Sequence, residues 1–164
     1  MTYDETHGAQ PAQMEVREEM RGEPSPLIQE RIVLEAVQMN LSGQVATAVV
    51  RLRERGRRVS SRSVGRNVEP KRLHLLGDAA VRALTELLPI GYGAVLADIQ
   101  PIATEVGEAV VAAVTLLAPD GEQVLMGVAR TETGMAEAAV RAVLNAVNRR
   151  LAFVSAEAPL ITVN

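Results

Sequence analysis

Arginine is the residue type with the most uneven distribution along this sequence. The 22 residues from Arg51 to Arg72 contain nine of the chain's 17 basic residues, opposed only by Glu54 and Glu69. Clustered guanidinium groups can bind an anionic partner such as a nucleic acid, a nucleotide or an acidic protein surface. The alternative is a solvated sheet surface whose charge prevents aggregation. The candidate anion-binding residues are Arg51, Arg53, Arg55, Arg57, Arg58, Arg62 and Arg66.

Residues that could catalyse a reaction or hold a metal are sparse. The chain has no cysteine, which excludes disulfides, thiolate metal ligands and cysteine nucleophiles. Its histidines are His7, near the N-terminus, and His74, which has no carboxylate at a useful spacing. The HExxH and DxDxDG metal motifs and the nucleophile elbow are also missing. We therefore name no catalytic residue, metal or cofactor, and favour a protein that is not an enzyme.

Two glycine-containing segments could be mistaken for functional loops. Gly91-Tyr92-Gly93 lacks the strand–loop–helix frame of a phosphate-binding loop, so we expect it to link two parts of the chain. Tyr92, one of three aromatic residues, is a candidate surface contact. Asp120-Gly121 is typical of a hairpin turn.

Composition indicates a globular protein with an unusual core. Of the 164 residues, 48% are hydrophobic, 23% are charged and 2% are aromatic, with a net charge of −3. The core must therefore be packed from small aliphatic side chains, and base-stacking nucleic-acid modules, which need aromatic platforms, are disfavoured. We find no signal-peptide pattern and no apolar run long enough to span a membrane, so we expect a cytoplasmic protein.

Hydrophobic periodicity predicts three strands and a helix in the first half. Apolar residues alternate from Ile32 to Ala36 and from Val45 to Leu52, and a third strand is expected from Arg58 to Val64. Ser42-Gly43 and Arg55-Gly56 are placed for hairpin turns. A helix starts at Pro70, carries apolar residues at helical spacing to Leu88, and ends at Pro89.

The second half repeats this plan. Strands are predicted at Val95–Ile99, Ala109–Leu117 and Gln123–Ala129, followed by a helix from about Thr133 to Leu151. Residues about 60 positions apart match, which indicates a duplication. The matched residues are Leu34 and Gln38 with Leu96 and Gln100; Ala48, Val50 and Leu52 with Ala112, Val114 and Leu116; and the pentapeptide Ala79–Ala83 with Ala138–Ala142.

The predicted fold is therefore α+β: a tandem βββα-βββα repeat with antiparallel sheets and two long helices packed on one side. A hotdog fold is the structural alternative. The run from Ala109 to Ala118 is apolar on both faces, which either a homodimer or a closed internal arrangement would explain. We expect a flexible leader at 1–27, with an optional short helix at 13–21; the duplicated domain at 28–153; and a tail or edge strand at 154–164.

Two segments of the second half carry a resemblance to known proteins. The two βββα units resemble, over residues ~31 to ~151, the C-terminal regulatory domain of α-isopropylmalate synthases, and Gly127-Val128-Ala129, followed by the helix with Ala138–Ala142, is similar to that domain's last strand and helix. Where that family's first helix begins with Gly-Pro-Val-Asp-Ala, this chain has Gly65-Arg66-Asn67-Val68-Glu69-Pro70. The ending Asn148-Arg149-Arg150-Leu151 also resembles uncharacterised stand-alone domains of high-GC bacteria. The first resemblance implies a dimerising domain that binds an amino acid.

Three functions from different classes follow from these observations. The favoured one is a non-enzymatic, homodimeric regulatory module that senses a small ligand, with a pocket between the repeats or at the dimer interface. The second is an anion- or nucleic-acid-binding module that uses the Arg51–Arg72 cluster. The third is a hotdog-type enzyme acting on thioesters.

Overall fold

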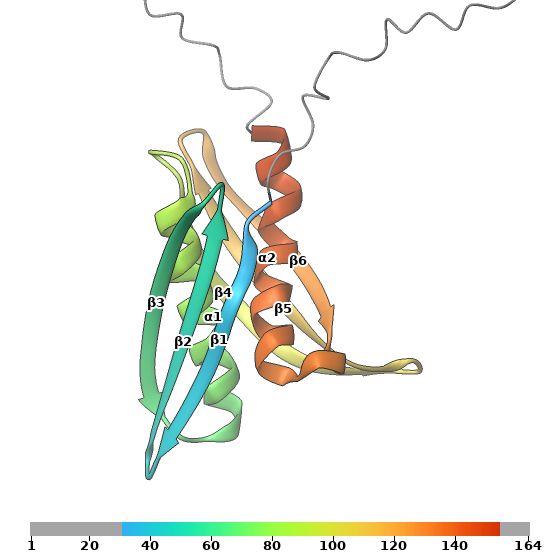
Figure 1. Cartoon of the computed structure of the whole chain (residues 1–164). Helices are drawn as coiled ribbons and strands as arrows, with labels where there is room; N and C mark the ends of the chain where they lie inside the picture. The colour runs from blue at the N-terminus through green and yellow to red at the C-terminus, as the bar shows by residue number, and fades with distance from the viewer. Residues whose placement is uncertain (1–30, 155–164) are drawn as a thin grey trace, which may run out of the picture.

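The two halves of the chain fold as two three-stranded antiparallel sheets, each followed by a helix (Figure 1). The computed structural model describes residues 31–154, so the predicted leader and tail lie outside the described residues. Sheet A is formed by β1 (Val33–Ser42), β2 (Val45–Glu54) and β3 (Arg57–Arg66), and α1 (Glu69–Leu87) follows it. Sheet B is formed by β4 (Gly93–Thr104), β5 (Gly107–Ala118) and β6 (Gly121–Arg130), followed by a short 3-10 helix, η2 (Thr131–Thr133), and α2 (Met135–Val154). This is the predicted βββα-βββα architecture.

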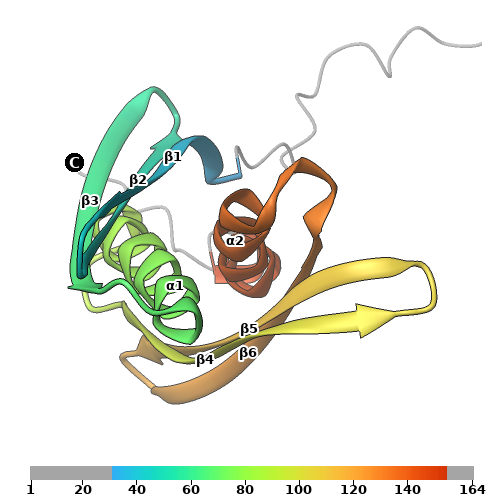
Figure 2. The ribbon, with the colours of Figure 1, turned by 90° about the horizontal axis from the view of Figure 1, so that it is seen from below.

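Both helices lie between the two sheets, as the end-on view shows (Figure 2). Helix α1 packs on β2 and β3 of its own sheet and also on β4, an edge strand of sheet B. Helix α2 packs on β5 and β6 and reaches across to β1, an edge strand of sheet A. Each helix therefore joins the two repeats, so the repeats share one core.

The central strand of each sheet supplies the sheet's contribution to that core. Alternate residues of β2 and β5 are almost fully buried, and the residues between them face away from the helices. The inward residues are Ala46, Ala48, Val50 and Leu52 in β2 and Val110, Ala112, Val114 and Leu116 in β5. Side chains this small let helix and sheet approach closely, and the approach is closest at Gly127 of β6, which lies against the backbone of Ala142 and Ala146 in α2.

Strand pairing confirms the duplication and corrects one part of its evidence. Val45 pairs with Arg66, and Ala109, which is 64 residues further on, pairs with Arg130. The β2–β3 ladder thus maps onto β5–β6 at this constant offset, as the strand matches indicated. The repeated pentapeptide does not follow the mapping, because Ala79 is the eleventh residue of α1 and its match is the fourth of α2. Seven residues are about two helical turns, so the pentapeptides occupy the same helix face at different heights.

Two further expectations need correction, and the structural alternative does not hold for the described residues. Strand β4 is much longer than the predicted Val95–Ile99, because an edge strand tolerates the missing N–H of Pro101. The second helix begins at Met135 rather than Thr133, since residues 131–133 form the 3-10 turn. The hotdog arrangement, in which one continuous sheet wraps a helix, is not the fold of residues 31–154, whose strands form two separate sheets.

Candidate functional site

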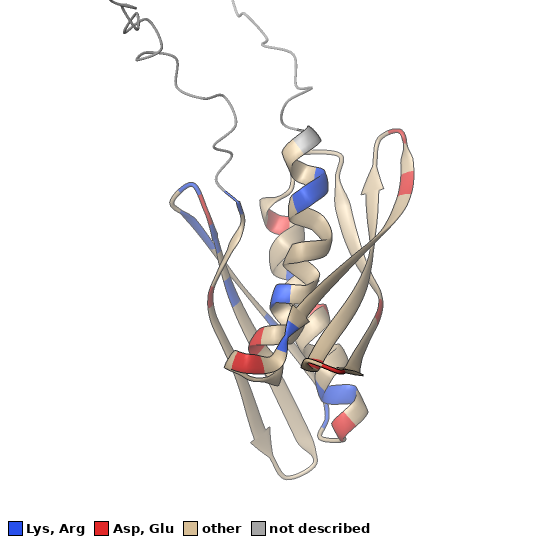
Figure 3. Cartoon of the chain, turned by 90° about the vertical axis from the view of Figure 1, so that its right-hand side faces the viewer, with Lys and Arg blue, Asp and Glu red and all other residues tan. Residues whose placement is uncertain are grey.

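The arginine cluster becomes a defined surface on sheet A. Residues of β2 and β3 alternate between the buried inner face and the exposed outer face, and five of the seven candidate arginines have outward positions. We call this surface the arginine face; its residues are Arg51, Arg53, Arg58, Arg62 and Arg66. Figure 3 shows basic residues on the strands and hairpin of sheet A, whereas sheet B carries mostly acidic residues near its hairpin tips.

The other cationic residues of the cluster lie elsewhere. Arg55 is in the β2–β3 turn with φ 47°, followed by Gly56 with φ 80°, the left-handed pair that a two-residue hairpin needs. Arg57, the first residue of β3, alternates with the inward-facing residues of the strand but is exposed there. Lys71 and Arg72 belong to α1. The structure therefore brings together five of the seven candidate residues and separates Arg55 and Arg57 from them.

Like charges face each other on the arginine face. The β2–β3 register places Arg53 directly opposite Arg58, an arrangement that destabilises an antiparallel pair. Glu35 on β1 partly neutralises the charge of Arg58, because its Oε1 accepts a hydrogen bond from Arg58 Nε at 2.7 Å. The Arg58 side chain is 68% exposed and that of Glu35 25%, so solvent screens the pair and limits its contribution to stability. Arg53 has no ion pair among the described residues, so a ligand anion could reduce the repulsion.

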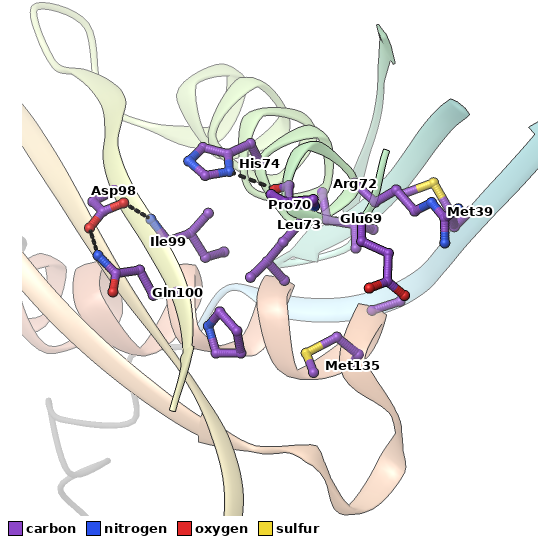
Figure 4. Close-up of a pocket in the computed structure, with 13 residues that line it drawn as sticks. Met39, Glu69, Pro70, Arg72, Leu73, His74, Asp98, Ile99, Gln100 and Met135 are labelled. Atoms are coloured by element: carbon purple, nitrogen blue, oxygen red, sulfur yellow. Dashed lines mark hydrogen bonds between the residues drawn. The ribbon is translucent and has the colours of Figure 1, made fainter. Parts of the chain in front are cut away.

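A second candidate site is a pocket at the seam between the two repeats, which we call the seam pocket. It has a volume of about 770 Å³. Its lining comes from β1 and α1 of the first repeat and from β4 and α2 of the second (Figure 4). Apolar side chains make up most of it: Met39, Pro70, Leu73, Leu76, Ile99, Pro101, Met135 and Ala136. Its location follows from the helix crossing, because the first turns of α1 and α2 meet there against the edge strand β4.

Polar groups of both charges border this apolar surface. They are Glu69, Arg72, His74, Asp98 and Gln100. Arg72 is held in place by the hydrogen bond from its Nε to Oδ1 of Asn67 at 2.7 Å. On the opposite wall, Asp98 accepts hydrogen bonds from the Ile99 amide, at 2.8 Å, and from the Gln100 side chain. The pocket therefore has an apolar interior and a rim that could bind both an anionic and a cationic group of one small molecule.

Sequence reasoning missed the residues of this pocket. His74 was set aside in the sequence because it has no carboxylate at a useful spacing. In the structure it is exposed, with Nδ1 3.0 Å from the Pro70 carbonyl oxygen. The fold nevertheless places His74 on the same pocket as Asp98, 24 positions later in the sequence. No local motif could have revealed this set, because its members lie on four elements. The one available signal was the duplication, which predicts an interface between the repeats.

The remaining candidates have structural roles. Tyr92 is half-buried and packs against the core at the start of the second repeat, and Asp120 lies in the β5–β6 hairpin turn. Within residues 31–154, no three His, Asp or Glu side chains are grouped as a metal site. No helix in the same range is long and apolar enough to cross a membrane.

Comparison of the sequence with protein-family models and with curated proteins gave no match.

Proposed function

We propose that this chain is a non-enzymatic regulatory module that senses a small amphipathic molecule in the seam pocket. The observation that carries the proposal is that both repeats line one mainly apolar pocket with a polar rim. A ligand there would contact α1, β4 and α2 together, and its binding energy would therefore hold the two repeats in one relative position. The chemical class that suits the lining is a molecule with an apolar body and a charged or zwitterionic head, such as an apolar amino acid.

The seam pocket suits ligand sensing better than catalysis. Its titratable groups, including His74 and Asp98, lie on the rim, and its interior is formed by aliphatic and thioether side chains. A catalytic pocket would need acid, base or nucleophile groups converging on one reacting atom. A buried apolar surface with charged groups at its mouth instead selects ligands by size and head group.

Ligand binding is tested by a thermal-shift screen of amino acids and nucleotides. A ligand at about 100 times its dissociation constant stabilises the folded state by about 2.7 kcal/mol, which raises Tm by roughly 5–10 °C for a chain of this size. We expect at least one apolar amino acid to produce such a shift, growing with concentration. A screen in which no compound changes Tm would reject the proposal.

A matched pair of substitutions locates the site. Ala136→Leu adds three carbon atoms to the wall of the seam pocket at the start of α2, whereas Ala152→Leu adds them at an exposed position near the end of the same helix. Alanine and leucine have similar helix propensities, so neither change should unfold the helix. The ligand-induced Tm shift should disappear in Ala136→Leu and persist in Ala152→Leu. An equal shift in both variants would place the ligand elsewhere.

A second candidate function is anion binding on the arginine face, and the Arg53–Arg58 opposition favours it. Exposed arginines that repel one another would be stabilised by a polyanion, whose affinity should fall steeply as salt is raised. The variant Arg51→Gln/Arg53→Gln/Arg62→Gln should lose binding to a nucleic-acid duplex at low salt. The control Arg130→Gln/Arg141→Gln/Arg149→Gln removes the same charge from sheet B and α2. Absence of binding by the unaltered protein at low salt would exclude this function.

A further inference from the structure

The outer face of sheet B differs from the equivalent face of sheet A. At the constant offset of 64 residues, Thr115, Leu117 and Met126 stand where sheet A has Arg51, Arg53 and Arg62. The inner faces have kept the same character, with Ala48, Val50 and Leu52 matched by Ala112, Val114 and Leu116. The two repeats therefore differ most where each sheet faces away from the shared core.

This surface of sheet B, which we call the apolar face, is unusually exposed for its composition. Met126 is 70% exposed, Val124 64% and Val128 51%, all on β6, and Val95 on β4 is 52% exposed. Alternate residues of β5, the central strand, lie half-buried between them. Within residues 31–154 no element covers this side of the sheet. A contiguous patch of this kind is typical of a protein–protein interface.

We propose that the apolar face binds a second copy of this chain, sheet against sheet. The central strand β5 carries no charged residue from Ala109 to Ala118, and sheets of small aliphatic residues pack face to face in this way. Asp98, which pairs with Ala113, is on the edge strand β4 and would lie at the margin of the contact. The arginine face cannot form the same contact, because its five cations would repel their equivalents. Self-association is therefore directed to sheet B.

Charged residues lie at the edges of the apolar face. Glu122 and Arg130 are at opposite ends of β6, so two copies with antiparallel β6 strands would bring opposite charges together at both ends. Arg130 already contacts Glu132 at 2.7 Å, and its charge would join a network at the rim. Asp98 lies on the edge strand β4, where its carboxylate is hydrogen-bonded to Ile99 and Gln100.

The sheet alone is too small for a stable dimer interface, so the proposed interface also includes the β4–β5 hairpin. The three strands have 10 to 12 residues each. Over the ten residues that they share, the sheet covers roughly 14 by 34 Å, or about 480 Å² per copy. A stable dimer buries about 800 Å² per copy. The hairpin extends away from the helices (Figure 2), and Val106 near its tip is 75% exposed. We expect this hairpin to lie along the second copy and to supply much of the remaining area.

The repeat provides a matched pair of variants for the test. Val128→Glu places a charge on the apolar face, and Val64→Glu places it at the equivalent position of sheet A, where the valine is 55% exposed against 51%. Both residues are at outward positions of β3 or β6, so circular dichroism should show that both variants fold. Met126→Glu is a second, independent change on the apolar face.

Molar mass is measured by light scattering on the full chain. We expect the unaltered protein and Val64→Glu to have twice the mass of one 17.6 kDa chain. Val128→Glu and Met126→Glu should each have the mass of a single chain. The dimer should persist at high salt, since its interface is apolar. A monomeric unaltered protein would overturn the proposal, as would a dimer that survives both changes on the apolar face or one that dissociates only in Val64→Glu.

Discussion

Alanine substitutions at two equivalent positions, Ser63 and Gly127, should change stability in opposite directions. Both residues lie on the inner face of the third strand of their repeat, 64 residues apart, opposite Ala48 and Ala112 respectively. Gly127 has its Cα hydrogen facing α2, and a Cβ there would overlap the Ala142 carbonyl oxygen and the Ala146 amide nitrogen. Ser63 already carries a side chain, because α1 leaves it room.

The cost of Gly127→Ala follows from what the new methyl group would meet. Backbone atoms inside a helix cannot rotate away, so α2 would have to move off β6 as a unit and lose packing along its length. Overpacking of a core costs 1–3 kcal/mol, and this case belongs at the upper end, at about 3 kcal/mol. For a chain of this size, that lowers Tm by roughly 10 °C.

The expected gain from Ser63→Ala has a different origin. The Ser63 side chain is 4% exposed, and its hydroxyl has no hydrogen-bond partner among the described residues. An unpaired buried hydroxyl costs about 1–3 kcal/mol, and alanine removes it while leaving only a small void. We expect a stabilisation of about 1 kcal/mol.

Urea unfolding monitored by circular dichroism measures both changes against the unaltered protein, with the midpoint shift at constant slope giving the free-energy difference. Gly127→Ala should unfold at lower urea and Ser63→Ala at higher urea. If Gly127→Ala cost less than 1 kcal/mol, α2 would not lie against β6 as described. If Ser63→Ala were clearly destabilising, its hydroxyl would have a partner.

Three other substitutions test separate contacts. Asn148→Ala removes two hydrogen bonds with the Ile32 backbone: the Ile32 N–H donates to Asn148 Oδ1 at 3.3 Å, and Asn148 Nδ2 donates to the Ile32 carbonyl oxygen at 3.1 Å. The change should cost about 1–2 kcal/mol and speed amide exchange at Ile32, and unchanged exchange would contradict this. Arg53→Gln removes the charge repulsion between Arg53 and Arg58, which face each other across β2 and β3, so it should raise Tm at low salt and raise it less at high salt. A lower Tm at low salt would mean that another group stabilises Arg53. Gly77→Ala should change the free energy of unfolding by less than about 1 kcal/mol. The gain in helix propensity offsets the close contact of the new methyl group with the movable ends of the Leu96 and Ile99 side chains. A loss as large as that of Gly127→Ala would show that these two side chains cannot shift.

Local pattern was sufficient for most of the secondary structure. Alternation in β2 and β5, and the leucines and alanines of α1 and α2, specify which side of each element is buried. The errors were at element ends, as at the start of α2, where a 3-10 turn precedes the helix. Such boundaries depend on a few hydrogen bonds, for example that from the Gly134 amide to the Thr131 carbonyl oxygen at 2.9 Å.

The repeated pentapeptide was one of the matches that indicated the duplication, but its two copies are not structurally equivalent. Ala79–Ala83 and Ala138–Ala142 are identical, but the helices that contain them are offset by seven residues. An alanine-rich helix face can shift by two turns and still bury the same side. The strand ladder cannot shift by one residue without exchanging its faces, so matches such as Leu52 with Leu116 carried the structural equivalence.

The sequence by itself determined the number and order of the elements, their buried sides, the duplication and the concentration of arginines, because each depends on residues close together in the chain. Only the tertiary structure decided that both helices lie between the sheets, that no described element covers the outer face of sheet B, and that His74 and Asp98 border a common pocket. Those properties depend on how four elements cross in space, and the small side chains that allow the close crossing, Gly77 and Gly127 among them, do not specify its geometry until both sheets are in place.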